Sequence, residues 1–88
     1  MNKSSVLEIL KEYISKEILD GKDMGLDAST PLLEWGIINS MEIARLVTFI
    51  QVQFSVEIPS EKITIEYFKD LNTISDLVID ISNEKDLA

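Results

Sequence analysis

The sequence predicts a small all-α bundle of three longer helices and one short helix, with a long loop between the first two helices. Three segments carry apolar residues at the spacing of amphipathic helices. The 3 Gly and 2 Pro of the chain suit compact helices better than a loop-rich fold. The chain has 88 residues, so we expect a single domain over residues 1–88. We expect its ordered core to span about residues 5–83 and its tail to fray over 84–88.

Residues 5–19 form the first predicted helix. Ser5 and Glu8 have the spacing of a capping box, in which the hydroxyl takes a backbone amide and the carboxylate reaches back. Gly21 is placed to end this helix. The apolar stripe of the helix consists of Val6, Ile9, Leu10, Tyr13, Ile14 and Ile18.

Residues 20–39 form a long connection that begins with the turn-rich stretch "DGKDMGLDASTP". A loop this long in a small domain needs anchors or a purpose. Trp35 could stack on a ligand, but no other aromatic residue is near it in sequence, so a place in the core or at its rim is favoured. "DGKDMGLD" lacks the ligand spacing and closing Glu of a calcium loop, so we expect no metal site. The expected anchors are Leu26, Leu32, Leu33, Trp35 and Ile37.

Residues 40–54 form the best-marked helix. Asn39 and Glu42 have capping-box spacing, and Ile38 and Ile43 have the spacing of a hydrophobic staple. These features predict a rigid turn that presents the first helical residue. The inward stripe consists of Ile43, Leu46, Val47, Ile50 and Phe54. Outside that stripe lie Met41, Phe49 and Val52, which are either exposed or covered by the preceding loop.

The sequence pattern of the last third of the chain predicts one short and one longer helix. Pro59 disfavours helix just before it. The stretch "TIEYFKD" predicts a short helix that begins at Thr64 and turns Ile65 and Phe68 inward. Residues 73–83 predict the last helix, which is capped by Thr73. The stripe of this helix consists of Ile74, Leu77, Val78 and Ile81.

Composition narrows the classes of function. The net charge of −8 argues against nucleic-acid binding. We find no signal peptide and no run long enough to span a membrane, and the chain has no Cys. A monomeric, cytoplasmic protein that does not insert into membranes is therefore expected. The charge is uneven, because residues 40–54 carry only Glu42 and Arg45 and are neutral.

Ser40 stands at the start of the neutral helix, in a chain that offers no partner for catalysis. The chain has no His and no Cys, so the common nucleophile–base pairs are absent, and we expect no catalytic residue. A serine at the first position of a helix lies beside free amides and the positive end of the dipole, which favours a phosphate ester. On position alone, the favoured interpretation of Ser40 is an ordinary polar residue at a helix start.

The stretch "EWGIINSMEIARLVTFIQVQFSVEIP" resembles the central motif of acyl carrier and peptidyl carrier proteins. Gly36 supplies the turn, Ser40 occupies the modified position and Met41 stands where Leu is usual. The later stretch "EYFKDLNTISDLV" resembles the family's short third helix and the start of its fourth. The resemblance therefore follows nearly the whole chain in order.

The resemblance implies that Ser40 carries 4′-phosphopantetheine, which a separate phosphopantetheinyl transferase takes from coenzyme A. The thiol of that arm holds acyl or aminoacyl cargo as a thioester, and the carrier itself catalyses nothing. The implied partners are the transferase, an adenylating acyl or aminoacyl ligase, and later acyl-transferring or condensing enzymes. An interaction module with this fold that never takes the arm is the alternative.

Two departures from the family pattern bear on partners. Asn39 replaces the usual Asp, and the second helix is neutral where fatty-acid carriers present several acids. This resembles a peptidyl carrier or a free-standing carrier of specialised metabolism, in biosynthesis of the polyketide or nonribosomal-peptide type. We expect partner docking to involve Asn39, Met41, Arg45 and Val52.

Overall fold

The computed structural model describes residues 2–19 and 26–87, with the side chains of α3 described as far as residue 84. All regular elements in these ranges are helical, which confirms the all-α class. None of the α-helices there is long and apolar enough to cross a membrane. The elements in chain order are α1 (Lys3–Tyr13), the π-helical turn η1 (Ile14–Ile18), α2 (Ser40–Phe54), the 3₁₀ turn η2 (Ser60–Lys62) and α3 (Leu71–Leu87).

The expected short fourth helix is not confirmed. Residues 65–68 form only turns, in which the amides of Tyr67 and Phe68 donate to the Thr64 carbonyl at 3.2 and 3.1 Å. At the end of this segment the Lys69 carbonyl accepts the Leu32 amide at 2.9 Å, which ties the segment to the loop before α2. The connection from α2 to α3 is therefore a loop with one isolated 3₁₀ turn.

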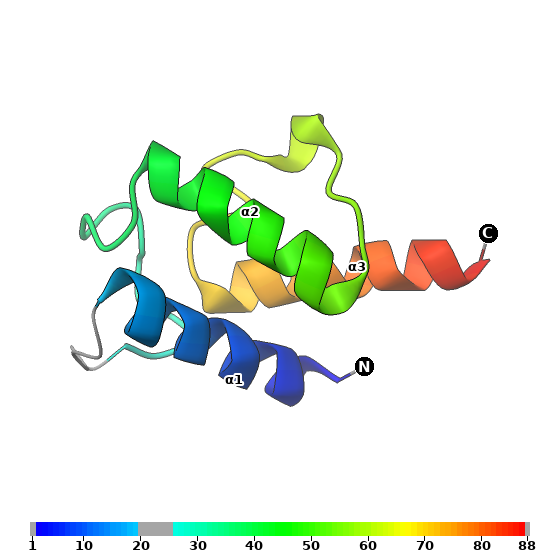
Figure 1. The fold of residues 1–88 in the computed structure, drawn as a ribbon, viewed down its shortest axis with the longest axis horizontal. Coiled ribbons are helices and arrows are strands. Elements are labelled where there is room, and N and C mark those ends of the chain that lie inside the picture. The colour runs from blue at the N-terminus through cyan, green and yellow to red at the C-terminus, as the bar shows by residue number, and fades with distance from the viewer. Residues whose placement is uncertain (1, 20–25, 88) are drawn as a thin grey trace.

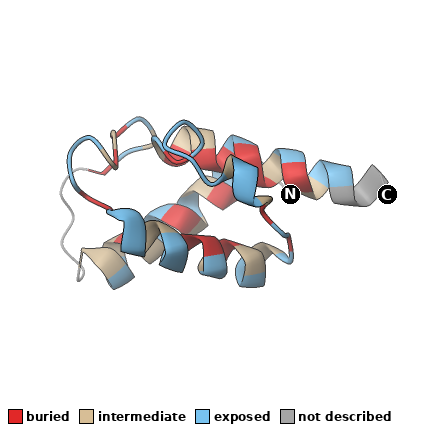
Figure 2. Cartoon of the chain, turned by 90° about the horizontal axis from the view of Figure 1, so that it is seen from above, coloured by how far each residue is buried: buried red, intermediate tan, exposed pale blue. Residues whose placement is uncertain are grey.

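The three α-helices enclose one core. Figure 1 shows the loop of residues 26–38, the start of α2 and the end of α1 at one end of the bundle, with both chain termini toward the other end. Buried positions recur along each helix between exposed ones (Figure 2). The predicted stripe of α3 is confirmed, because Ile74, Leu77, Val78 and Ile81 are all buried.

The first helix begins earlier than the sequence predicted. Asn2 is its N-cap, and the Asn2 side-chain oxygen accepts the Ser5 amide at 2.8 Å. The expected capping box of Ser5 and Glu8 is therefore wrong, since Ser5 is the amide donor of the cap. After Tyr13 the helix continues as η1, and the expected stop at Gly21 lies outside the described residues.

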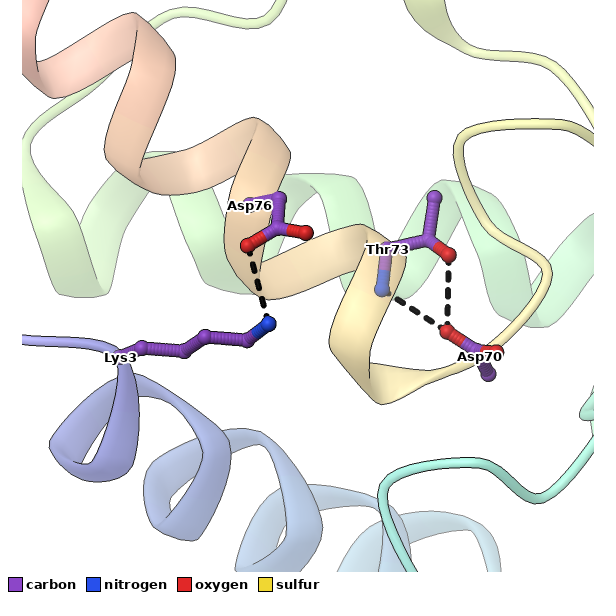
Figure 3. Close-up of polar contacts among 4 residues, drawn as sticks. All are labelled: Lys3, Asp70, Thr73 and Asp76. Carbon is purple, nitrogen blue, oxygen red and sulfur yellow. Dashed lines mark hydrogen bonds and ion pairs between the residues drawn. The ribbon is translucent and has the colours of Figure 1, made fainter.

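The third helix also begins earlier, and it ends later. Both the amide and the hydroxyl of Thr73 donate to the Asp70 carboxylate at 2.8 Å (Figure 3), so Asp70 caps α3 and the expected cap at Thr73 is wrong. The helix runs to Leu87, past the predicted end at residue 83. Lys3 and Asp76 form a 3.1 Å ion pair that joins α1 to α3 (Figure 3).

Candidate functional site

Ser40 is the first residue of α2 and is exposed. A reciprocal capping box brackets it, as the sequence predicted. The Asn39 side-chain oxygen accepts the Glu42 amide at 3.0 Å, and the Glu42 carboxylate accepts the Asn39 amide at 3.0 Å. Because both ends of the first turn are tied together, the backbone that carries Ser40 is held in one conformation.

The turn before Ser40 is fixed from the core side. The amides of Ile37 and Ile38 both donate to the Leu32 carbonyl, at 2.9 and 3.2 Å. Ile38 is buried and Ile43 packs against the core, which agrees with the predicted hydrophobic staple. Gly36 has a φ of +72°, in the left-handed region that glycine adopts without strain.

Two backbone hydrogen bonds join the loop that precedes α2 to the start of α3. The Leu32 amide donates to the Lys69 carbonyl at 2.9 Å, and the Asn72 amide donates to the Ala28 carbonyl at 3.0 Å. Thr30 is buried nearby, and its hydroxyl accepts the Asp27 amide at 2.9 Å. These hydrogen bonds fix the loop before Ser40, and with it the start of α2, relative to α3.

Most of the expected loop anchors are in the core. Leu26, Leu32 and Ile37 are buried, and Leu33 packs against the buried cluster. Trp35 is different, because 65% of its surface is exposed, so the expected place in the core or at its rim is wrong. Leu33 and Ile37, two residues away on either side, supply the anchoring, and the turn between them leaves the indole outside.

A surface hollow of about 280 Å³ lies beside Ser40 and was not foreseen from the sequence. Ile65 is 72% exposed at its edge, so the expectation that Ile65 turns inward is wrong, whereas Phe68 is fully buried as expected. A helical spacing assigned Ile65 to the core, but the segment forms turns. The hollow is lined by Ser40, Ile43, Ile63, Thr64 and Ile65.

The residues around Ser40 fit an attached phosphate ester. Within the described ranges, the Ser40 hydroxyl makes no hydrogen bond, and the amides of Ser40 and Met41 have no acceptor. Unpaired amides at a helix start favour an anion. Over the same ranges, no three His, Cys, Asp or Glu side chains gather as a group that could hold a metal ion.

Comparison with known proteins agrees with this geometry. The model of the family described as "Phosphopantetheine attachment site" matches residues 5–81. The chain belongs to this family of carrier proteins. Such carriers bear a covalently bound 4′-phosphopantetheine, have no catalytic activity of their own, and work with a phosphopantetheinyl transferase and with biosynthetic enzymes.

One curated relative and one solved structure illustrate what this carrier resembles. This chain is 35% identical over 69 residues to the "Probable acyl carrier protein PigG" of Serratia sp. (strain ATCC 39006). The match covers 78% of this chain and 79% of that protein. This chain is also 35% identical, with a TM-score of 0.73, to a chain in a solved structure described as "Crystal structure of FAD-dependent dehydrogenase". That match covers 78% of this chain and 97% of the solved chain, so the solved chain is itself of carrier size.

An exposed stripe runs along α2 of the carrier, away from the core. Met41 and Val52 are 75% and 78% exposed, and Arg45 between them is also exposed. Their spacing of four and seven residues places them on one face of the helix. Phe49 does not belong to this stripe, because it is partly buried and stacks on Tyr13 of α1 with ring centroids 4.1 Å apart.

Proposed function

We propose that Ser40 carries the 4′-phosphopantetheine arm and that this chain presents acyl or aminoacyl cargo to partner enzymes. The observation that carries the proposal is the position of Ser40. It is exposed at the start of α2, beside two backbone amides that have no acceptor, and it lies within the residues that the family model matches. Ser75, by contrast, is fully buried in α3 and out of reach of a transferase. When bound, the arm supplies a thiol that holds the cargo as a thioester.

The roles of the chain's own residues follow from their places. Asn39 and Glu42 hold the turn before the arm is attached, and the amides of Ser40 and Met41 would donate to the phosphate oxygens. In the loading step the Ser40 oxygen forms a bond to phosphorus and loses its proton to a base of the transferase. The adenosine bisphosphate part of coenzyme A leaves. This chain needs no internal base for that step.

The test is intact mass after incubation with coenzyme A and a broad-specificity phosphopantetheinyl transferase. We expect the wild type to gain the mass of one arm and Ser40→Ala to gain none while remaining folded. Ser60→Ala is the matched control, because Ser60 is also exposed and also begins a helical turn, η2. An arm on the Ser40→Ala protein would overturn the assignment. A wild type that takes no arm would favour the alternative, an interaction module with a carrier fold.

We further propose that partners dock on the exposed stripe of α2. Met41 and Val52 would make apolar contacts, Arg45 would set the register, and Asn39 would tune the choice of partner. The support is the exposure of two apolar side chains on a neutral helix of an acidic protein. Affinity should change little between about 50 and 300 mM salt, because screening acts on exposed charges. A steep loss of affinity with salt would place docking on the acidic surface instead.

Loading of cargo by an adenylating ligase tests the same stripe. Val52→Glu places a charge among the apolar contacts and should weaken loading without unfolding the carrier. Thr48→Glu is the control for added charge, since Thr48 is an exposed polar residue of the same helix. Equal loading of the wild type and the Val52→Glu variant would show that the stripe is not part of the docking surface.

Biosynthesis of the polyketide or nonribosomal-peptide type remains our proposal for the pathway, with condensing or acyl-transferring enzymes downstream. The similar solved structure, described as that of an FAD-dependent dehydrogenase, adds an enzyme of that class as a candidate partner. Such an enzyme would remove two hydrogens from the carried group, with a hydride passing to the flavin and a proton to a base. We expect the flavin to bleach under anaerobic conditions with the loaded carrier. Bleaching to the same extent by the free acid would contradict a role for the carrier.

A further inference from the structure

Glu42 lies at the same helix end as the attachment serine. It is the third residue of α2, and its carboxylate accepts the Asn39 amide at 3.0 Å, which holds the charge at the first turn. One helical turn rises only about 5.4 Å. Any anion attached to Ser40 therefore shares the positive end of the helix dipole with this carboxylate.

Glu42 forms no ion pair with any cation in the described part of the chain. The ion pairs there join Lys3 to Asp76 and Lys16 to Glu12. Arg45 lies three residues after Glu42 on the helix, yet the two form no ion pair. No direct cation contact therefore neutralises Glu42 beside an anionic group on Ser40, and solvent and salt screen their repulsion.

We infer that Glu42 and the phosphate of the arm compete for the start of α2, so that attaching the arm loosens the Asn39–Glu42 capping bond. This inference rests on the proposed function. The neighbouring hollow, whose lining includes Ile43, Ile63 and Ile65, adds no further charge to this competition.

The neutral Asn39 fits the same account. It caps the helix through its amide oxygen and adds no charge, so Glu42 is the single carboxylate of the capping box. An Asp at this position would put a second carboxylate beside the phosphate. The phosphate and two carboxylates would then share the two free amides at the helix start.

The experiment measures hydrogen exchange of the Asn39 amide by ¹⁵N NMR, before and after the arm is attached. Glu42→Gln is the test variant, because Gln keeps an oxygen for the capping box and removes the charge. Glu57→Gln is the control, since Glu57 is exposed and follows α2 at the end opposite Ser40. Intact mass first establishes that each protein carries the arm.

In the wild type we expect attachment to speed exchange of the Asn39 amide about two- to fivefold at low salt, the factor typical of charges at helix ends. The increase should shrink at about 300 mM salt and be absent in Glu42→Gln. Glu57→Gln should behave like the wild type. Unchanged exchange in an armed wild type, or an equal increase in armed Glu42→Gln, would overturn the inference and leave the carrier function intact. If the chain takes no arm, both this inference and the proposed carrier function are contradicted.

Discussion

Replacing Asn39 by Ala removes the acceptor of the best-defined local interaction around Ser40. Asn39 Oδ1 accepts the Glu42 amide at 3.0 Å, and the bond that the Asn39 amide donates to the Glu42 carboxylate depends on the same turn. Loss of an N-cap of this kind costs about 1 kcal/mol. In a domain of this size, about 1 kcal/mol lowers the melting temperature by roughly 4–8 °C. We therefore expect thermal unfolding, followed by far-UV circular dichroism, to shift by that amount.

Replacing Asn39 by Asp separates the cap from the charge. Asp keeps the acceptor, and its charge at the helix start is favourable by about 0.3–1 kcal/mol. The nearby Glu42 carboxylate opposes this gain, so stability should change little. Loading by a transferase with a basic docking surface should be faster for Asp at low salt. An unshifted melting temperature for Asn39→Ala would refute the capping argument, and equal loading rates for Asn and Asp would refute its electrostatic part.

Three further experiments test the fold that holds the site. Asp70→Ala removes the cap of α3 and should lower the free energy of unfolding by about 1 kcal/mol, measured with urea. A double-mutant cycle of Tyr13→Leu and Phe49→Leu should give a coupling of about 0.5–1.5 kcal/mol, and no coupling would show that the stack adds nothing beyond burial. Ser75→Ala removes a fully buried hydroxyl with no hydrogen-bond partner among the described residues, so it should stabilise the protein by about 1 kcal/mol.

The second helix could be predicted from the sequence because its signals are local. The bounds 40–54, the Asn39–Glu42 capping box and the staple of Ile38 and Ile43 all depend on residues within one or two turns of one another. Local rules of this kind hold when propensity, capping and apolar spacing agree. The same agreement places Ser40 at the first helical position from the sequence alone.

The starts of α1 and α3 could not be predicted in this way. In each case two good capping residues lie three apart, Asn2 with Ser5 and Asp70 with Thr73, and local rules do not choose between them. For α3, tertiary packing decides. Leu71 is 1% exposed and lies before the predicted start of α3, so extending the helix buries it.

The predicted places of Trp35 and Ile65 are wrong for a different reason. Both residues are apolar, which favours the interior, and the prediction for Ile65 also depends on a helical period in its segment. Trp35 lies in turns of the expected connection and Ile65 lies in turns in place of the expected helix, and turns do not impose a repeating inward face. The hollow beside Ser40 arises from this departure, so spacing along a helix could not have revealed it.

The proposed attachment residue, Ser40, must be held still and also left free, and the start of α2 meets these two demands with different groups. The capping box engages the amides of Asn39 and Glu42, and the staple engages the side chains of Ile38 and Ile43. Neither uses the hydroxyl of Ser40 or its amide. The stability of the turn therefore does not depend on the groups that an attached arm would occupy. The carboxylate of Glu42 is the exception, because it supports the turn and repels an anion on the serine, and this places the electrostatic cost of attachment on one side chain.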